Sequence, residues 1–195
     1  MDPKADLFRK TLSNIKELNQ EKMEQARQRW DDLAKPPGSL GKLEEIGIKL
    51  SGITGKIYPE VNQKSHIVMV GDHGVTEEGV SAFPREITTA MVHNFLQGGA
   101  AINILARQIG AEIQVVDIGV KDKIRAENLI VNKIKPGTDN MARGSAMSRE
   151  EARKSITVGI ETVSARIKQG ANLIGTGEMG IGNTTPATAI VAAAT

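Results

Sequence analysis

The chain has 195 residues, 39% hydrophobic and 25% charged, and a formal net charge of +2. These proportions describe a soluble globular protein. The sequence has no dense Lys/Arg run, which argues against a nucleic-acid partner, and it has no cysteine, which excludes disulfides and thiolate metal sites. Without a signal-peptide core or an apolar run long enough to span a bilayer, we expect a cytoplasmic protein that makes no membrane contact.

The first 60 residues are expected to be helical. Residues 5–34 carry scattered apolar side chains among many charges, and the prolines and glycines of 35–42 (KPPGSLGK) must end any helix there. A second helix is then predicted by apolar residues spaced three and four apart, which are Leu43, Ile46, Leu50 and Ile53. We therefore expect 1–60 to form a small helical domain or satellite layer.

Three short apolar runs bounded by glycine follow, at 66–70, 112–120 and 172–177. Such runs are typical of strands that are buried on both faces of a parallel sheet. Because helical patterns separate them, the predicted fold is α/β, a Rossmann-like doubly wound parallel sheet over 61–195 with the small helical layer at the N-terminus.

The helices between these strands have clear boundaries. Residues 86–109 are interrupted by Gly98-Gly99 and stopped by glycine at position 110. Residues 148–169 open with Ser148 and Glu151, which are spaced as a capping box. The predicted apolar stripe of this second helix consists of Ala152, Ile156, Ile160, Val163 and Ile167.

Each predicted strand ends in an unusual loop, at 71–86, 117–121 and 175–185. In doubly wound sheets, ligands bind outside the carboxyl ends of the strands. The sequence therefore places a candidate binding site where these three loops meet.

The loop of 177–187 (GEMGIGNTTPA) suits a phosphate monoester, because glycines let amide groups approach an anion at a helix N-terminus. Thr184 or Thr185 can cap the helix, with Pro186 in its first turn. A tight strand-to-helix turn explains the glycines equally well. The acid Glu178 would repel a phosphate, so we expect it to bind a sugar hydroxyl, a water or loop amides.

The loop after the first strand also carries candidate side chains. Asp72 and His73 suggest a metal or acid–base site, but the chain has three histidines and no His-x-x-x-His pair, and Asp72 is equally suited to cap the following turn. We expect no metal. Phe83 and Met91 are candidates for the wall of a flat-ligand pocket, or for ordinary core.

Taken together, five blocks resemble the nicotinate-nucleotide–dimethylbenzimidazole phosphoribosyltransferase family of cobalamin lower-ligand synthesis. They occur in the family's order, at 35–44, 71–107, 117–120, 137–147 and 175–189. The resemblance implies transfer of the phosphoribosyl group of nicotinate mononucleotide to 5,6-dimethylbenzimidazole, giving α-ribazole 5′-phosphate and nicotinate. It also implies a homodimer that uses no cofactor.

The resemblance further assigns roles to residues. The phosphate and ribose site would be formed by Glu178, Gly180, Gly182, Asn183 and Thr184. The benzimidazole pocket would include Ser81, Phe83 and Met91.

In the family the general base is a glutamate in the C-terminal part of a longer chain, beyond the position of Thr195. The last ten residues, PATAIVAAAT, are apolar and carry no helix stop signal, so we expect this chain to be an N-terminal portion. Two alternatives stay open: a non-catalytic module that binds nucleotide or benzimidazole, and an unrelated α/β protein sharing only the glycine loop.

Overall fold

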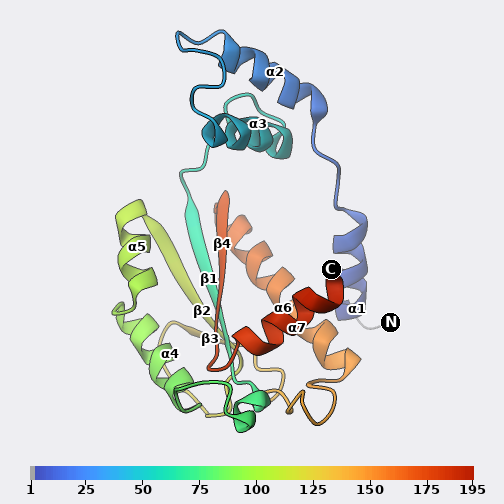
Figure 1. Ribbon diagram of the computed structural model, residues 1–195, viewed down its shortest axis with the longest axis vertical. Coiled ribbons are helices and arrows are strands. Elements are labelled where there is room, and N and C mark those ends of the chain that lie inside the picture. The colour runs from blue at the N-terminus through green and yellow to red at the C-terminus, as the bar shows by residue number, and fades with distance from the viewer. Residues whose placement is uncertain (1–2) are drawn as a thin grey trace. The chain divides into compact units, whose positions relative to one another are not determined.

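The computed structural model describes residues 3–195 (Figure 1). Its helices and strands are, in chain order, α1 (Pro3–Ser13), α2 (Gln20–Asp31), α3 (Lys42–Thr54), β1 (Lys64–Gly71), the 3-10 helix η1 (Gly74–Glu78), α4 (Ile87–Gln97), α5 (Ala101–Ile109), β2 (Ala111–Gly119), β3 (Leu129–Val131), α6 (Arg149–Lys168), β4 (Leu173–Met179) and α7 (Thr184–Ala194). None of the helices in this range is long and apolar enough to cross a membrane.

The chain divides into two compact units, a helical unit of Leu12–Val61 and an α/β unit of Asn62–Thr195 with the residues before Leu12. The domain boundaries expected from the sequence, 1–60 and 61–195, remain a proposal; residues 1 and 2 lie outside the described range.

The prediction of helix throughout 5–34 is wrong in its middle, because the backbone leaves the helix between Ser13 and Gln20. Asn19 starts the new helix: its side-chain oxygen accepts a hydrogen bond from the Lys22 amide at 3.0 Å. This cap satisfies one of the amides that the first turn of a helix leaves without a partner. The expected break at 35–42 is confirmed.

The second predicted helix is confirmed as α3, but its large apolar residues do not face α2. Leu43, Ile46 and Ile53 are each more than half exposed. Small residues make the contact instead: a β-carbon on Gly47 would lie 2.9 Å from the Trp30 ring, and one on Gly52 would lie 2.6 Å from the Met23 side chain. The helices approach closely because these two positions carry no side chain.

The α/β unit contains a four-stranded parallel sheet with strand order β3-β2-β1-β4. This confirms the predicted fold class and the three predicted strands. The strand β3, of three residues, was not predicted, since so short a run shows no recognisable pattern. β4 extends to Met179, two residues past the predicted end, so Glu178 belongs to the strand.

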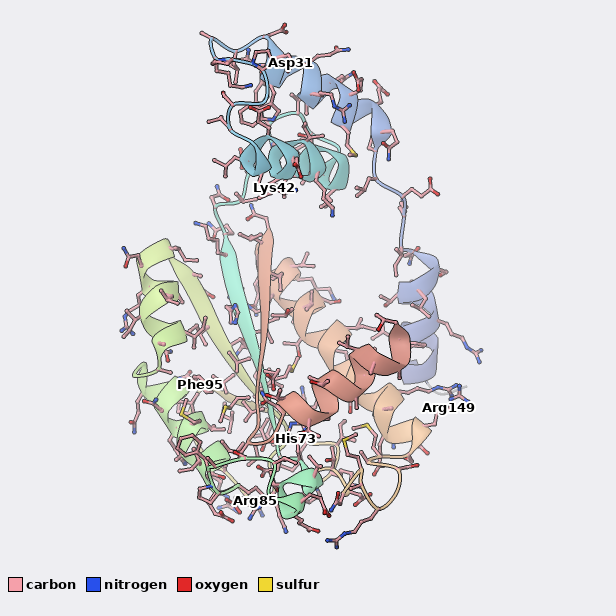
Figure 2. The ribbon with its side chains drawn as sticks, in the orientation of Figure 1. Asp31, Lys42, His73, Arg85, Phe95 and Arg149 are labelled. Atoms are coloured by element: carbon pink, nitrogen blue, oxygen red, sulfur yellow. The ribbon has the colours of Figure 1, made fainter. Side chains whose placement is uncertain are left out.

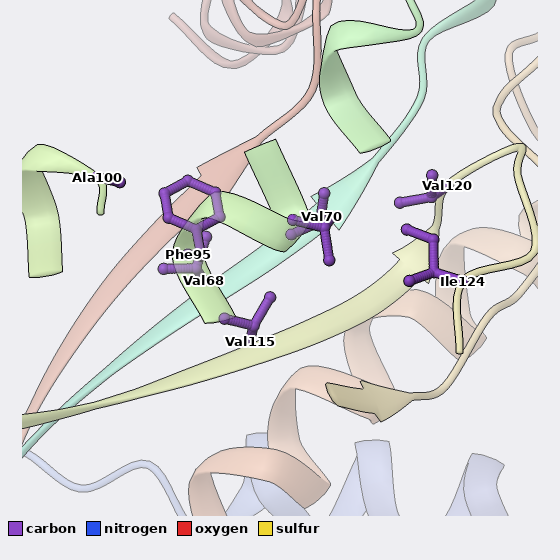
Figure 3. Packing of buried hydrophobic residues seen from close by; sticks show 8 residues of the cluster. Val68, Val70, Phe95, Ala100, Val115, Val120 and Ile124 are labelled. Atoms are coloured by element: carbon purple, nitrogen blue, oxygen red, sulfur yellow. The ribbon is translucent and has the colours of Figure 1, made fainter. Parts of the chain in front are cut away.

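The sheet is covered on both faces. On one face Val68 and Val70 of β1 pack with Phe95 of α4 and Val115 of β2 (Figure 3). On the other face the neighbouring β1 residue Ile67 packs with Val116 of β2 and Val158 of α6. Successive residues of one strand therefore serve opposite helical layers, as a doubly wound sheet requires.

The capping box of α6 is confirmed: the Ser148 amide donates to Glu151 Oε2 at 2.7 Å and the Glu151 amide donates to Ser148 Oγ at 3.2 Å. The apolar stripe predicted for α6 is wrong in part, because Ile156 and Ile167 are at least half exposed. The residues of α6 that are buried are Thr157, Val158 and Thr162.

The strand order reverses beside β1. The chain passes from β1 through β2 to β3 in one direction and then returns through α6 to β4 on the opposite side of β1 (Figure 1). The carboxyl ends of β1 and β4 thus flank a topological switch point, which is where open α/β sheets bind ligands.

Candidate functional site

A cavity of about 310 Å³ lies at this switch point. Its lining comes from the carboxyl ends of β1, β2 and β4, from α6 and α7, and from the loop after β3. The residues that carry polar or charged side chains into the lining are Asp72, His73, Lys135, Thr138, Glu151, Ser155, Glu178 and Asn183. The expected convergence of the strand-end loops is confirmed.

Asp72 joins the loops after β1 and β2. Its side chain is buried, and Oδ2 accepts hydrogen bonds from the Lys121 amide at 2.7 Å and from Arg85 Nη1 at 3.4 Å. The interpretation of Asp72 as a cap of the following turn is therefore wrong, and η1 has no side-chain cap. Oδ1 is also buried and has no partner within the described part of the chain, so the carboxylate keeps one unsatisfied acceptor beside the cavity.

His73 lies where the sheet ends, next to the start of α7 (Figure 2). Burial lowers the pKa of its imidazole, while the negative charges of Glu178 and Asp72 act in the opposite direction. Burial is the larger influence, which favours a neutral ring at pH 7 that can both donate and accept a hydrogen bond.

Glu178 and Asn183 form a pair at the end of β4. Asn183 Nδ2 donates a hydrogen bond to Glu178 Oε1, and both residues line the cavity. Asn183 also occupies the N-cap position of α7 without a side-chain cap bond, so the expectation that Thr184 or Thr185 caps this helix is wrong. The expected place of Pro186 in the first turn is confirmed.

The glycines before α7 pack closely against the end of β1 and η1. Gly180 is buried, and a β-carbon there would lie 2.1 Å from the carbonyl oxygen of Gly71. Gly182 has φ +81° and lies next to Thr76, so it needs the left-handed conformation that glycine adopts without strain. Neither glycine lines the cavity; Thr184 is exposed and does not line it either.

Lys135 is the cation of the cavity, and sequence reasoning missed it. Its Nζ lies 2.6 Å from Asp139 Oδ2 and 3.7 Å from Glu151 Oε1. The hydrogen bond to Asp139 raises the pKa of Lys135, whereas the bonds from Ser148 lower the pKa of Glu151. A single lysine in an irregular loop carries no sequence signal, and only the fold brings it to the sheet edge.

The three residues expected in the base pocket do not line this cavity. The Phe83 side chain is 65% exposed, and the Phe83 amide donates to Ser81 Oγ at 3.2 Å. Met91 is partly buried against the core cluster that contains Val68 and Phe95. Their assignment to a base pocket remains a prediction.

A neighbouring cavity of about 440 Å³ shares His73, Thr138, Met147, Pro186 and Ile190 with the first. Most of its remaining lining is apolar, contributed by Val75, Met141, Ala146, Ala189 and Ala193. The two cavities therefore adjoin along these shared residues, and the wall of each is mostly apolar.

These features define a doubly wound α/β protein with a candidate ligand site at its topological switch point. A family model described as phosphoribosyltransferase matches residues 15–195, and the chain belongs to that family. The resemblance drawn from the five sequence blocks is confirmed.

The relatives agree with this assignment. The chain is 53% identical over 188 residues to a nicotinate-nucleotide–dimethylbenzimidazole phosphoribosyltransferase of Geobacter sulfurreducens, covering 96% of this chain and 53% of that relative. To the protein of the same name from Desulforudis audaxviator it is 50% identical over 186 residues, with coverage of 95% and 53%. The chain thus spans about half the length of these curated relatives.

A solved structure shares the fold. The crystal structure of the nicotinate-nucleotide–dimethylbenzimidazole phosphoribosyltransferase from Thermus thermophilus superposes with a TM-score of 0.87 at 45% sequence identity. The superposition covers 90% of this chain and 54% of the other.

Proposed function

We propose that this chain carries the phosphoribosyl-binding side of an enzyme that transfers the phosphoribosyl group of nicotinate mononucleotide to 5,6-dimethylbenzimidazole, giving α-ribazole 5′-phosphate and nicotinate. The observation that carries the proposal is the cavity between the ends of β1 and β4, which the first turn of α7 borders. The likeness to relatives that bear this name supports it.

The nucleotide's phosphate would bind at the loop formed by Gly180, Gly182, Asn183 and Thr184. The partial positive charge of the α7 N-terminus favours an anion there, and the Asn183 amide adds a side-chain donor. Glu178 would accept hydrogen bonds from ribose hydroxyls. The hydrogen bond from Asn183 to Glu178 supports this proposal, because it holds the proposed phosphate-binding amide beside the proposed ribose-binding acid.

The benzimidazole would bind near Ser81, Phe83 and Met91. Because the Phe83 ring is mostly exposed, it can cover a flat ligand without disturbing the core. Phosphoribosyl transfer with inversion needs the attacking ring nitrogen and the anomeric carbon held in line, so the principal task of these residues is positioning. We assign the general-base role to none of the residues described above.

We further propose a homodimeric, cytoplasmic protein, as the family resemblance implies. The cysteine-free sequence is compatible with a reducing compartment. Light scattering on the purified chain, with a mass of 20.9 kDa per copy, tests the dimer directly.

The proposed function is tested by calorimetric titration with nicotinate mononucleotide, followed by a chromatographic assay for α-ribazole 5′-phosphate. Asn183→Asp places a negative charge at the phosphate site and is expected to abolish saturable binding. Asn172→Asp is the matched control, because Asn172 makes its contacts at the opposite end of β4, to Gln63 and Asn62. Equal affinity of both variants would overturn the phosphate assignment. Binding without transfer would favour the non-catalytic module.

A further inference from the structure

The beginning of α4 is hydrogen-bonded to the loop after each of three strands. Arg85, two residues before the first residue of α4, donates a hydrogen bond to Asp72 after β1 at 3.4 Å. Thr89 Oγ1 donates to Asp122 Oδ2 after β2 at 2.7 Å. Between them, Thr88 Oγ1 accepts a hydrogen bond from the Ile181 amide, in the loop after β4, at 3.1 Å.

Of Arg85, Thr88 and Thr89, Thr88 is the residue that is buried. Thr88 is 0% exposed, so its hydroxyl is held in one place by the surrounding core. The Ile181 amide lies in the turn between Gly180 and Gly182, and two residues before Asn183. Glycine restricts the backbone least of all residues, so a turn flanked by two glycines depends on outside contacts for its conformation.

We propose that Thr88 is a positioning residue for the phosphoribosyl substrate: its buried hydroxyl holds the 180–184 turn in the conformation that binds the phosphate. The inference deepens the proposed function and rests on it. It also connects the two halves of the site, because Thr88 lies within the 81–91 segment assigned to the benzimidazole. This hydrogen bond would transmit a shift of the start of α4 around the base to the phosphate turn.

The test compares Thr88→Val, which keeps the shape but removes the hydroxyl, with Thr88→Ser, which keeps the hydroxyl. Thr157→Val is the matched control: Thr157 is 1% exposed, and its hydroxyl donates to the Arg153 carbonyl within α6 at 2.9 Å. Each variant is titrated with nicotinate mononucleotide, and hydrogen exchange of the amides of 180–184 is followed without ligand.

In Thr88→Val we expect roughly tenfold weaker binding and about tenfold faster exchange in the turn, because the partly buried Ile181 amide loses its acceptor. Thr88→Ser keeps the bond to the Ile181 amide, and Thr157→Val removes a hydroxyl that bonds within α6 and not to the turn. Both variants should therefore stay within about twofold of the unmodified chain in affinity and in exchange of the turn.

Faster exchange in Thr88→Val with unchanged affinity would overturn the positioning role and leave the proposed function standing. Unchanged exchange would overturn the inference itself. If the unmodified chain does not bind nicotinate mononucleotide, the proposed function is refuted. The exchange measurement then still decides whether Thr88 holds the turn.

Discussion

Replacing Gly180 with alanine tests the close approach of β4 to β1 at the proposed site. The added β-carbon would lie 2.1 Å from the Gly71 carbonyl oxygen and 2.7 Å from His73 Nε2. The first of these is a backbone atom in the central strand of the sheet, which no rotamer change can move away. Relief therefore requires the turn before α7 to move by roughly 1 Å to reach ordinary van der Waals separation.

Overpacking of this kind typically costs about 1–3 kcal/mol of unfolding free energy. We expect Gly180→Ala to lose roughly 2 kcal/mol, which corresponds to a fall in Tm of about 4–8 °C for a chain of this size. Because the same movement displaces Asn183, affinity for nicotinate mononucleotide should fall by roughly 10- to 100-fold. Urea unfolding and calorimetric titration measure the two effects.

Gly159 provides the matched control. It lies inside α6, and a β-carbon there would meet nothing within 4 Å. Gly159→Ala should therefore raise the free energy of unfolding by about 0.5–1 kcal/mol, since alanine is the better helix former. If Gly180→Ala unfolds at the same urea concentration as the unmodified chain, the close contact between the turn and β1 is refuted.

Four further predictions concern charge and capping. Glu178→Gln removes a negative charge that raises the pKa of His73, so an NMR titration should show the pKa of His73 lowered further. A rise would contradict the electrostatic interaction between Glu178 and His73. Burial holds the folded-state pKa of His73 below 6.5, so near this pH the unfolded chain binds more protons than the folded one. The free energy of unfolding should therefore fall as the pH drops below about 6.5, and it should fall less steeply in His73→Asn. Urea unfolding across this pH range measures both. Ser148→Ala should cost about 1 kcal/mol in urea unfolding and raise the pKa of Glu151, because the N-cap of α6 is lost. Lys35→Met should raise the pKa of Glu44 toward 4.5 in a carboxylate NMR titration, and an unchanged value would show that the 2.8 Å ion pair does not form in solution.

The strands β1, β2 and β4 were predictable because they depend on local pattern. β1 and β2 are apolar runs ended by glycine, and the break between α4 and α5 falls at Gly98, whose φ of +79° closes the first helix. From alternating strands and helices the doubly wound sheet follows by general rules of chain topology. The location of the site at the carboxyl edge needed no further information.

The faces of the helices were harder to predict, because hydrophobicity was the wrong guide to burial. In α6, Thr157 and Thr162 are buried because each hydroxyl donates to the carbonyl four residues earlier, at 2.9 and 2.8 Å. That bond removes the cost of burying a polar group, so threonine serves there as a small apolar residue. In α3 the contact with α2 depends on the glycines at 47 and 52, whose importance shows only once the partner's Trp30 is in place.

The polar side chains of the candidate site could not be predicted as a group, because contacts between distant segments bring them together. Lys135, Glu151 and Asp72 come from three segments that nothing in the sequence pairs, although Asp72 was recognised as a candidate by its place after a strand. Its actual partners, Arg85 and Lys121, lie 13 and 49 residues further along the chain. A pattern search within one segment cannot find such contacts.

The sequence left two explanations for the glycines before α7, a phosphate cradle and a tight turn. The structure gives the turn a specific reason: without a side chain at 180, the turn that follows β4 can pass directly against the Gly71 carbonyl at the end of β1. This contact brings Asn183 and the first turn of α7 to the switch point beside Glu178. A bulkier residue would hold the helix N-terminus away from the cavity, and its dipole effect falls off within one turn. The compact turn is therefore a requirement of the proposed phosphate site, and the two explanations describe one arrangement.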